Sequence, residues 1–277
     1  MKPEELAEEI DPGNYRFLQQ HVYSHAGLVL DDDKHYLLES RLAPIVRRLE
    51  LQSINELCTL IRSPRQRDLA RQVAEAVTTS ETYFFRDPAQ YRAIKDVLLP
   101  RLLSERRNTR RLRFWSAASS TGQEAYSLAM LLIEAGLPGW DIEILGSDFS
   151  SAVIERARAG RYLQIEVNRG LPSSLLVRYF RRQGTDWILS DEVRKMVTFE
   201  ILDLRANASP PRSFDLVFCR NVMIYFDVQT KLKILAQLRR TILPGGWLLL
   251  GGAETISGIE EHFDRLPLQD ATAYVAR

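Results

Sequence analysis

Hydrophobic positions recur at helical spacing through the first part of the chain. Phe17, Leu18, Val22 and Ala26 follow a period near 3.6 residues, which predicts a helix over residues 14–27. Strand-like alternation is sparse before about residue 76. The pattern therefore predicts an all-helical N-terminal region.

Capping signals and prolines divide this region into further helices. Three aspartates at 31–33 can cap a helix that runs through Leu42, and Pro44 is expected to kink or restart that helix. The segment 53–56, Ser-Ile-Asn-Glu, resembles a capping box, and Pro64 is placed to begin another helix.

Short apolar runs alternate with helical patterns in the rest of the chain. The runs predict strands at Leu112–Ser116, Ile142–Ser147, Val197–Ile201, Leu216–Cys219 and Trp247–Gly251, with Tyr274-Val275 in a final strand. The helical patterns cover Ala89–Glu105, Gln123–Ala135, Ser151–Ala159 and Val228–Leu243. This alternation predicts an α/β domain with a parallel, doubly wound sheet.

One interval interrupts the alternation. The stretch between Ala159 and Met196 is longer than the usual connection between a helix and a strand. It contains a helical piece, Ser173–Phe180, and an apolar run, Trp187–Leu189. We therefore expect an inserted β-hairpin subdomain.

The patterns together predict three parts of the chain. Residues 1–76 form a helical domain, and residues 77–87 form a linker that contributes to the functional site. Residues 88–277 form the α/β domain, with the inserted β-subdomain at about 160–196.

A turn of small residues follows the first predicted strand. It ends at Gly122, with the acid Glu124 opening the next helix. One glycine stands where a dinucleotide loop needs three, which argues against a nicotinamide dehydrogenase. An acid at this place suits a ligand with positive charge or hydroxyl groups, and S-adenosylmethionine has both.

Acids also follow the second and third predicted strands. Asp148 is placed to accept hydrogen bonds from ribose hydroxyls, or alternatively to cap the next helix together with Ser150. Asp203 is placed to contact an adenine ring, or alternatively to remain a solvated loop acid.

A second block combines a buried strand with polar and aromatic residues. Arg220 and Asn221 end the strand, where α/β folds bind ligands, and Tyr225 follows in an apolar loop. Arg220 and Asn221 are candidates to meet the ligand, and Tyr225 to face the reacting carbon. The alternative is an arginine paired with a structural acid and a tyrosine in the core.

Two further segments carry charge. Residues 78–87 are more aromatic than an ordinary linker, so we expect them to fold over a site where Arg86 can neutralise a carboxylate. The alternative is an interdomain contact with a surface arginine. Arg41, Arg47 and Arg48 belong to a basic run in the helical region, which is either a solvated face or a surface that attracts an acidic partner.

Composition narrows the classes of function. The net charge of +1 disfavours a dedicated nucleic-acid binder. Two distant cysteines and four scattered histidines predict neither a disulfide framework nor a metal site. We expect a cytoplasmic protein, because the first residues have no apolar signal core and 242–253 is too short to span a bilayer.

Several blocks together resemble the CheR family of chemotaxis receptor glutamate methyltransferases. The matching stretches are TTSETYFFRD (78–87), FWSAASSTGQEAYSLAM (114–130), Asp148, FCRNVMIYFD (218–227) and LPGGWLLLGGAE (243–254). The resemblance implies a Rossmann-like class I methyltransferase sheet with an inserted subdomain, preceded by an all-α domain. It also implies S-adenosylmethionine as donor, S-adenosylhomocysteine as product, and no metal.

The resemblance carries over to single residues. The positions that match family contacts to the donor are Ser80, Thr82, Arg86, Glu124, Asp148, Asp203, Leu204, Arg220 and Asn221. Arg86 and Tyr225 fall near the transferred methyl group and are the catalytic candidates. The basic helices with Arg41, Arg47 and Arg48 look like the surface that recognises the receptor.

Three departures from the family pattern stand out. Gln123 and Ala125 flank Glu124 where the family commonly has Glu and Pro, and Ser80 and Asp203 stand where Asn is frequent. The side chains of Ser80 and Asp203 can still form hydrogen bonds. The turn at 183–187 looks shorter than in members whose insert binds a pentapeptide at the receptor tail, so we expect independence from that tether.

The implied function is methylation of glutamate side chains on the cytoplasmic domain of chemoreceptors, for adaptation. We expect a monomer that inserts into no membrane and binds no nucleic acid. The alternatives are a small-molecule or nucleic-acid methyltransferase with the same donor, and a non-catalytic module that senses the donor.

Overall fold

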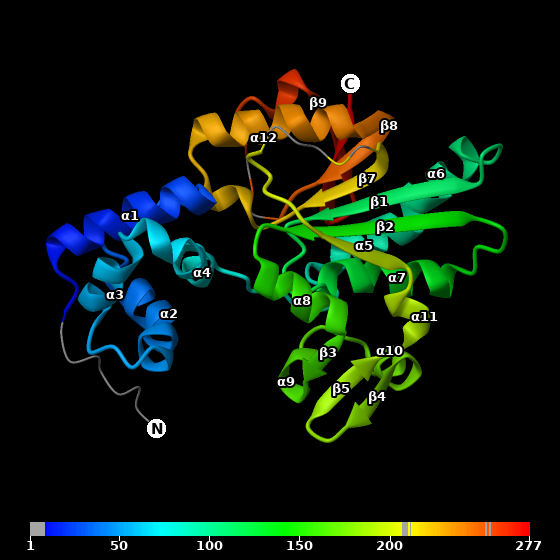
Figure 1. The fold of residues 1–277 in the computed structure, drawn as a ribbon. Coiled ribbons are helices and arrows are strands. Elements are labelled where there is room, and N and C mark those ends of the chain that lie inside the picture. Colours follow the sequence, from blue (N-terminus) through cyan, green and yellow to red (C-terminus); the bar gives the residue numbers. More distant parts are fainter. Residues whose placement is uncertain (1–8, 207–209, 211, 253, 255) are drawn as a thin grey trace. The chain divides into compact units, whose positions relative to one another are not determined.

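Tertiary contacts divide the chain into two units: Met1–Thr79 with Tyr225–Asp227, and Ser80–Ile224 with Val228–Arg277. The structure, a computed structural model, describes residues 9–206, 210, 212–252, 254 and 256–277 (Figure 1). The start of the predicted helical domain and Ala253 of the last matching block lie outside the described residues.

Helices build the N-terminal unit, as the hydrophobic period predicts. They are α1 (Pro12–Ala26), α2 (His35–Arg48), α3 (Ile54–Ile61), a 3-10 turn (Pro64–Gln66) and α4 (Arg67–Val77). The apolar side chains that face one another are fully buried, among them Leu18, Val22, Leu38, Leu42, Leu57 and Val73. The expected helices at 14–27, after Ser53 and after Pro64 are confirmed. Ser53 Oγ accepts the N–H of Glu56 at 3.3 Å.

The start of α2 differs from its prediction. The helix begins at His35, and the preceding Lys34 has no capping side chain. The aspartate triplet at 31–33 therefore does not cap it. The Asp31 carbonyl instead accepts the hydroxyl of Tyr15 at 2.6 Å, which ties the connection back to α1.

Pro44 also behaves differently from the prediction. Helix α2 continues through it to Arg48, so the expected restart is wrong. A proline removes one backbone donor, but the buried Leu42, Ile45 and Val46 around it keep the helix packed against its neighbours. Arg41 and Arg48 consequently share one helix.

The second unit is built on a seven-stranded sheet of order β6-β2-β1-β7-β8-β10-β9. The strands are β1 (Arg111–Ala117), β2 (Asp141–Asp148), β6 (Val197–Ile201), β7 (Phe214–Cys219), β8 (Ile242–Leu249), β9 (Phe263–Leu268) and β10 (Ala271–Ala276). The five strands from β6 to β8 pair in parallel, as predicted, whereas β10 runs antiparallel to both β8 and β9.

Helices cover both faces of this sheet. Figure 1 shows α12 (Val228–Thr241) on one side, with α7 (Gln123–Ala135) and α8 (Ser151–Ala159) on the other. The segment before β1 runs continuously through α5 (Pro88–Ala93), a π-helical turn (Ile94–Leu98) and α6 (Leu99–Glu105). The sequence pattern predicts α7 and α8 to the residue, but it misses β9 and begins β8 five residues too late.

The strand order fixes where a ligand can bind. From β1 the chain proceeds to β2 and β6 on one side, and then returns to β7 and β8 on the other. The order therefore reverses between β1 and β7. Open α/β sheets bind ligands at such a switch point, outside the carboxyl ends of the strands.

The insert is a three-stranded antiparallel sheet of order β3-β5-β4. It contains β3 (Arg161–Leu163), α9 (Gln164–Val167), α10 (Ser173–Tyr179), β4 (Phe180–Gln183), β5 (Asp186–Leu189) and α11 (Asp191–Arg194). The predicted hairpin is β4–β5, and β3 adds a strand that the sequence pattern does not show. Among the described residues, no helix is long and apolar enough to cross a membrane.

Candidate active site

The loop after β1 has an unusual backbone. Ala118, Ser120 and Gly122 have φ values of 66°, 49° and 92°, in the left-handed region. Such conformations cost free energy in residues other than glycine, and they cluster at functional sites. Because the loop lies at the switch point of the sheet, its strain marks the ligand site.

The neighbouring strand β2 holds this loop in place. The N–H of Ser119 donates to the Ser147 carbonyl at 2.8 Å, and the N–H of Ser120 donates to Asp148 Oδ2 at 3.0 Å. Asp148 Oδ1 accepts the N–H of Ser150 at 3.1 Å, where α8 begins. Asp148 thus organises the loop and the helix start. Carboxylate oxygens are acceptors of the kind that bind hydroxyl groups.

Two other segments close the loop from outside the sheet. The Ser120 hydroxyl donates to the Ser80 carbonyl at 2.7 Å, and the Tyr162 hydroxyl of β3 donates to the Thr121 carbonyl at 2.8 Å. The insert and the segment after residue 79 therefore both shape the same turn.

A buried ion cluster lies at the ends of β1 and β7. The Arg220 side chain is 1% exposed; its Nη1 donates to Glu124 Oε2 at 2.9 Å and its Nη2 to Asp87 Oδ2 at 2.6 Å. Nη2 also donates to the Arg86 carbonyl at 2.7 Å. Burial disfavours the charged guanidinium, but the carboxylates of Glu124 and Asp87 outweigh it and raise the pKa of Arg220.

This cluster has two carboxylates for one guanidinium. The second oxygen of Glu124 accepts the Ser116 hydroxyl of β1 at 2.7 Å, so Glu124 joins β1, α7 and β7. These three side chains carry an excess of one negative charge, and because Arg220 and Glu124 are shielded from water while Asp87 is half-buried, the cluster favours a cationic ligand. The arginine–acid pair that sequence analysis offered as the alternative for Arg220 is therefore present, and Glu124 is its partner.

Asn221 is held by its backbone. Its φ is 58°, and its N–H donates to Glu254 Oε2 at 2.7 Å. The same oxygen accepts the N–H of Gly251 at 2.7 Å. A Cβ on Gly251 would lie 2.6 Å from Asn221 Nδ2, so only glycine leaves room for that amide.

Residues 80–87 fold into the second unit rather than forming a free linker. Phe84 is fully buried, with its ring 5.0 Å from that of Tyr162 and edge-on to it. The half-buried Arg86 donates Nη1 to the Glu81 carbonyl at 3.1 Å and lies over the Tyr83 ring. Among the described residues, no carboxylate pairs with Arg86, which leaves its charge available to an anionic group.

The end of β6 lies beside that of β2, because the Leu202 N–H donates to the Asp148 carbonyl at 2.9 Å. The Asp203 carboxylate is engaged locally: Oδ2 accepts Arg205 Nη2 at 2.7 Å, and Oδ1 accepts the Arg205 N–H at 2.9 Å. Asp203 is therefore neither a free loop acid nor joined to the Arg220 cluster. Leu204 is half-buried in the same turn.

The remaining predicted residues lie elsewhere. The Ser80 side chain is exposed and Thr82 is half-buried. Tyr225 is grouped with the helical unit, where its carbonyl accepts the Val29 N–H at 3.1 Å. The Arg220 cluster belongs to the other unit, and the role of Tyr225 stays a prediction.

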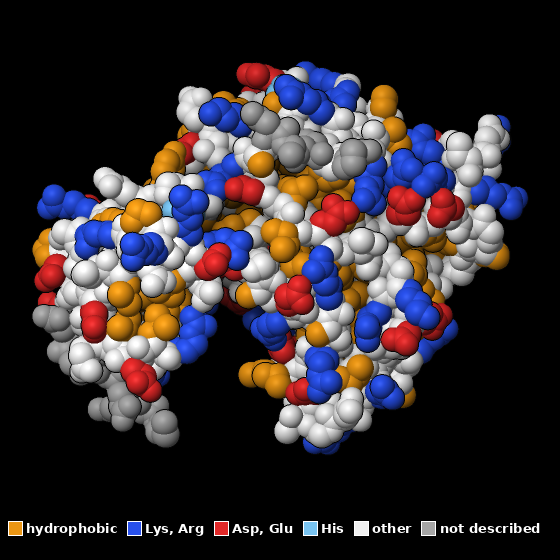
Figure 2. Space-filling model, viewed as in Figure 1, with side chains coloured by type: hydrophobic (Ala, Val, Ile, Leu, Met, Phe, Trp, Pro, Cys, Tyr) orange, Lys and Arg blue, Asp and Glu red, His pale blue; other side chains and the backbone are white. Residues whose placement is uncertain are grey.

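The predicted receptor surface lies on α2. Arg47 and Arg48 are exposed, and Arg41 is half-buried. Arg48 donates to Gln72 Oε1 at 2.8 Å. Figure 2 shows Lys and Arg side chains exposed on the helical unit, at the left of the view.

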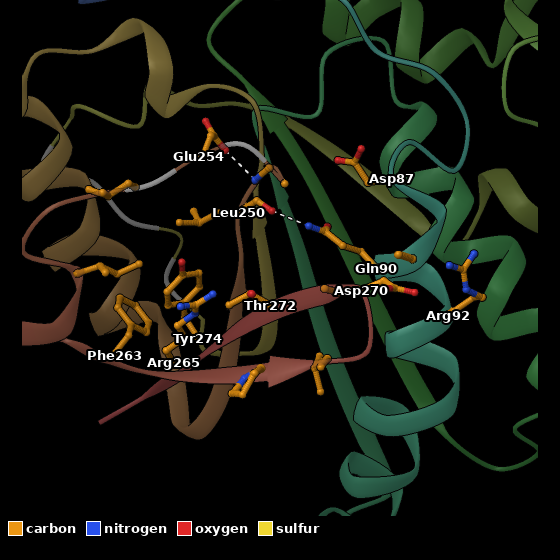
Figure 3. Close-up of a pocket in the computed structure, with 18 of the residues that line it drawn as sticks. Asp87, Gln90, Arg92, Leu250, Glu254, Phe263, Arg265, Asp270, Thr272 and Tyr274 are labelled. Carbon is orange, nitrogen blue, oxygen red and sulfur yellow. Dashed lines mark hydrogen bonds between the residues drawn. The ribbon is translucent and has the colours of Figure 1, made fainter.

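Asp87 and Glu254 are residues that the sequence interpretation did not single out. Each holds one member of the Arg220-Asn221 dipeptide, and both line a cavity of about 940 Å³ between α5 and the β8–β10 region (Figure 3). Each is the last residue of a block that resembles the CheR family, FFRD and GGAE. Their place as the last acid of each matching block is the signal that could have identified them.

The site fits S-adenosylmethionine on its own chemistry. Its excess negative charge suits a sulfonium or an ammonium group, and Asp148 is placed for hydroxyl groups. The loop also holds a buried hydroxyl, Ser119 Oγ, that has no partner among the described residues. The described part of the chain has no group of three or more histidine, cysteine or acidic side chains that could hold a metal ion.

The strained loop, the switch point and the acid-rich cluster define an α/β protein that binds a nucleotide-like, cationic ligand. Comparison with known families gives the particular family. Residues 80–272 match the family model "CheR methyltransferase, SAM binding domain", and residues 13–78 match "CheR methyltransferase, all-alpha domain". The chain belongs to the CheR methyltransferase family.

Curated relatives agree over nearly the whole chain. The chain is 36% identical to chemotaxis protein methyltransferase 1 of Vibrio cholerae over 270 residues, which cover 96% of this chain and 97% of the relative. It is 35% identical to chemotaxis protein methyltransferase 1 of Pseudomonas aeruginosa over 257 residues, which cover 91% and 93% of the two chains.

Proposed function

We propose that this chain transfers the methyl group of S-adenosylmethionine to glutamate side chains on the cytoplasmic domain of chemoreceptors. It then acts in the cytoplasm as a protein-glutamate O-methyltransferase. The observation that carries this proposal is the buried Arg220–Glu124–Asp87 cluster at the sheet's switch point, in a chain of the CheR family.

The residues around the switch point would hold the donor. Glu124 and Asp87 offer negative charge, and Asp148 offers acceptors for the ribose. Asn221 presents its side-chain amide from a fixed backbone. When bound, S-adenosylmethionine supplies an electrophilic methyl group on a sulfonium.

The acceptor needs no general base. A glutamate side chain has a reference pKa of about 4.3, so it is already ionised at neutral pH. Since an anion reacts with a cation, water stabilises the separated reactants more than the transition state. Excluding water and aligning the two groups should therefore provide much of the rate.

Arg86 is the residue that we assign to alignment. No described carboxylate engages its guanidinium, so it can orient an incoming carboxylate or the donor. Tyr225 is proposed to close the site. Arg86→Ala should lower turnover by about 100-fold and leave the fold intact, because misplacing a reacting group costs about that much.

The assay is methyl transfer from labelled donor to a receptor fragment, with mass mapping of the modified residues. Arg169→Ala is a matched control, because Arg169 also binds Glu81 and lies over the Tyr83 ring, at 4.3 Å, yet matches no donor position. A near-normal rate of methyl transfer by Arg86→Ala would show that Arg86 does not align the reacting groups. Wild-type protein that methylates no receptor fragment would overturn the proposed function.

We further propose that methylation does not depend on a receptor-tail pentapeptide. The hairpin β4–β5 turns through only Gly184 and Thr185, which supports the short turn seen in the sequence. Calorimetry with an isolated pentapeptide should show no tight binding, and receptors lacking the tail should be methylated at the full rate. Tight binding would contradict this proposal.

A further inference from the structure

Asp87 has a backbone conformation that its helix does not require. It precedes α5 with φ 59° and ψ 69°, in the left-handed region. Aspartate before a helix usually accepts a backbone N–H of the first turn, but this side chain makes no such bond. Its carboxylate binds Arg220 at 2.6 Å instead.

Strain of this kind persists only where the surroundings impose it. The surroundings here are the buried guanidinium of Arg220, which already has Glu124 as one counter-charge. A single carboxylate would neutralise the arginine. Asp87 is the second, so it changes the cluster from neutral to an excess of one negative charge.

Glu254 holds the next residue by a different means. It forms no ion pair with a described cationic side chain; its Oε2 accepts the N–H groups of Asn221 and Gly251. Glu254 therefore fixes a backbone geometry, whereas Asp87 fixes a charge. Figure 3 shows both residues at the same cavity, with the Glu254 hydrogen bond drawn.

We propose that Asp87 is a positioning residue that sets the net charge of the donor site and favours the cationic donor over its neutral-sulfur product. Glu254 is its geometric counterpart, which positions Asn221 for both ligands alike. This inference rests on the proposed function. Its chemical basis is that methyl transfer turns a sulfonium into a thioether, so the product lacks one positive charge.

The test is calorimetry of S-adenosylmethionine and S-adenosylhomocysteine with the full chain. Asp87→Asn keeps the shape and tolerates the left-handed backbone, but it removes the charge. It should weaken the donor about fivefold to tenfold more than the product, as expected for one unit charge at short range in a partly dehydrated site. Asp87→Glu should restore the wild-type preference.

Two other variants separate charge from geometry. Glu254→Asp should weaken both ligands by the same factor, because the shorter side chain withdraws the acceptor of the Asn221 N–H but keeps the carboxylate charge. Asp270→Asn is the matched control: Asp270 lines the same cavity and also has a positive φ of 55°, but no contact joins it to Arg220. Both affinities should stay at the wild-type values.

Equal weakening of donor and product by Asp87→Asn would overturn the inference and leave Asp87 a purely structural role. If Asp87→Asn fails to fold, Asp87→Gly serves instead, since glycine adopts the left-handed backbone without cost. Failure of the wild-type chain to bind the donor would reject the proposed function, which is a distinguishable result.

Discussion

The two units use their arginines in different ways. In the methyltransferase unit, Arg106 and Arg220 bind acids from distant parts of the chain, and Arg106 Nε lies 2.7 Å from Asp215 Oδ1. In the helical unit, Arg71 lies near two acids of its own helix, Asp68 at 3.8 Å and Glu75 at 3.6 Å, while the exposed Arg65 and Arg67 form no ion pair with any described carboxylate. The first pattern joins distant parts of the protein, whereas the second leaves positive charge exposed.

This contrast shows that a net charge near zero does not describe either unit. Arginines of one unit are paired with acids inside it, whereas most arginines of the other unit are exposed. A buried arginine between two acids contributes to the fold, because losing either partner leaves an uncompensated charge. Exposed arginines contribute little to stability and act through their field on charged partners. Removing a buried arginine from the methyltransferase unit should therefore lower the free energy of unfolding. Removing exposed arginines from the helical unit should leave it nearly unchanged and weaken the binding of a charged partner.

The largest effect is expected from Arg220→Ala. It leaves the buried Glu124 and the half-buried Asp87 without their cation, which should cost about 3–5 kcal/mol of unfolding free energy and abolish donor binding. Urea unfolding followed by circular dichroism measures the loss. Arg277→Ala is the control, because the exposed Arg277–Asp264 pair should contribute less than about 1 kcal/mol. Similar losses in the two variants would contradict the contrast.

A smaller effect of opposite kind is expected from Arg47→Ala combined with Arg48→Ala. Stability should change by less than about 1 kcal/mol, while KM for a receptor fragment rises about tenfold at low salt and donor affinity is unchanged. The difference should shrink at high salt. Arg265→Ala, an exposed arginine of the other unit, is the control. An unchanged KM in the double variant would remove these arginines from the receptor surface.

The smallest effect concerns pH and the helical unit. His21 is buried and its Nε2 donates to the Ala70 carbonyl at 2.7 Å. Burial lowers the pKa of His21; the Ala70 carbonyl partly offsets this, and His25 lowers it further. The unfolded chain therefore binds a proton at higher pH than the folded one, and stability should fall as pH drops through about 6.5.

Urea midpoints at pH 7.5 and pH 5.5 measure this loss. His21→Gln keeps a donor for Ala70 but does not titrate, so its midpoint should depend less on pH. His262→Gln in the other unit should behave as the wild type. An equal pH dependence in His21→Gln and wild type would refute the assignment.

The sequence predicts the elements whose apolar residues recur with a regular local spacing. Helices α7 and α8 have the predicted bounds because apolar spacing and their flanking residues mark the ends: Gly122 and Gly136 flank α7, and Ser150 and Gly160 flank α8. Pro44 misleads because tertiary packing outweighs one lost hydrogen bond. Strand β9 is missed because its exposed, charged residues carry no strong alternation.

The candidate site also has residues that the sequence predicts and contacts that only the structure shows. Glu124, Asp148, Arg220 and Asn221 are predicted from the ends of strands and from the resemblance, and the structure collects them around one end of the sheet. The sequence cannot show that Asp87 is the second partner of Arg220, because the two are 133 residues apart. Nor does it show that Arg205 engages Asp203, since a solvated acid has the same local pattern.

The hydrogen bond from Tyr162 to Thr121 has a consequence for the evolution and engineering of this chain. The insert is not an accessory that can be exchanged freely, because its first strand is bonded to the strained loop after β1. A chimaera that takes the insert of a relative should therefore also disturb that loop, unless position 162 keeps its hydroxyl.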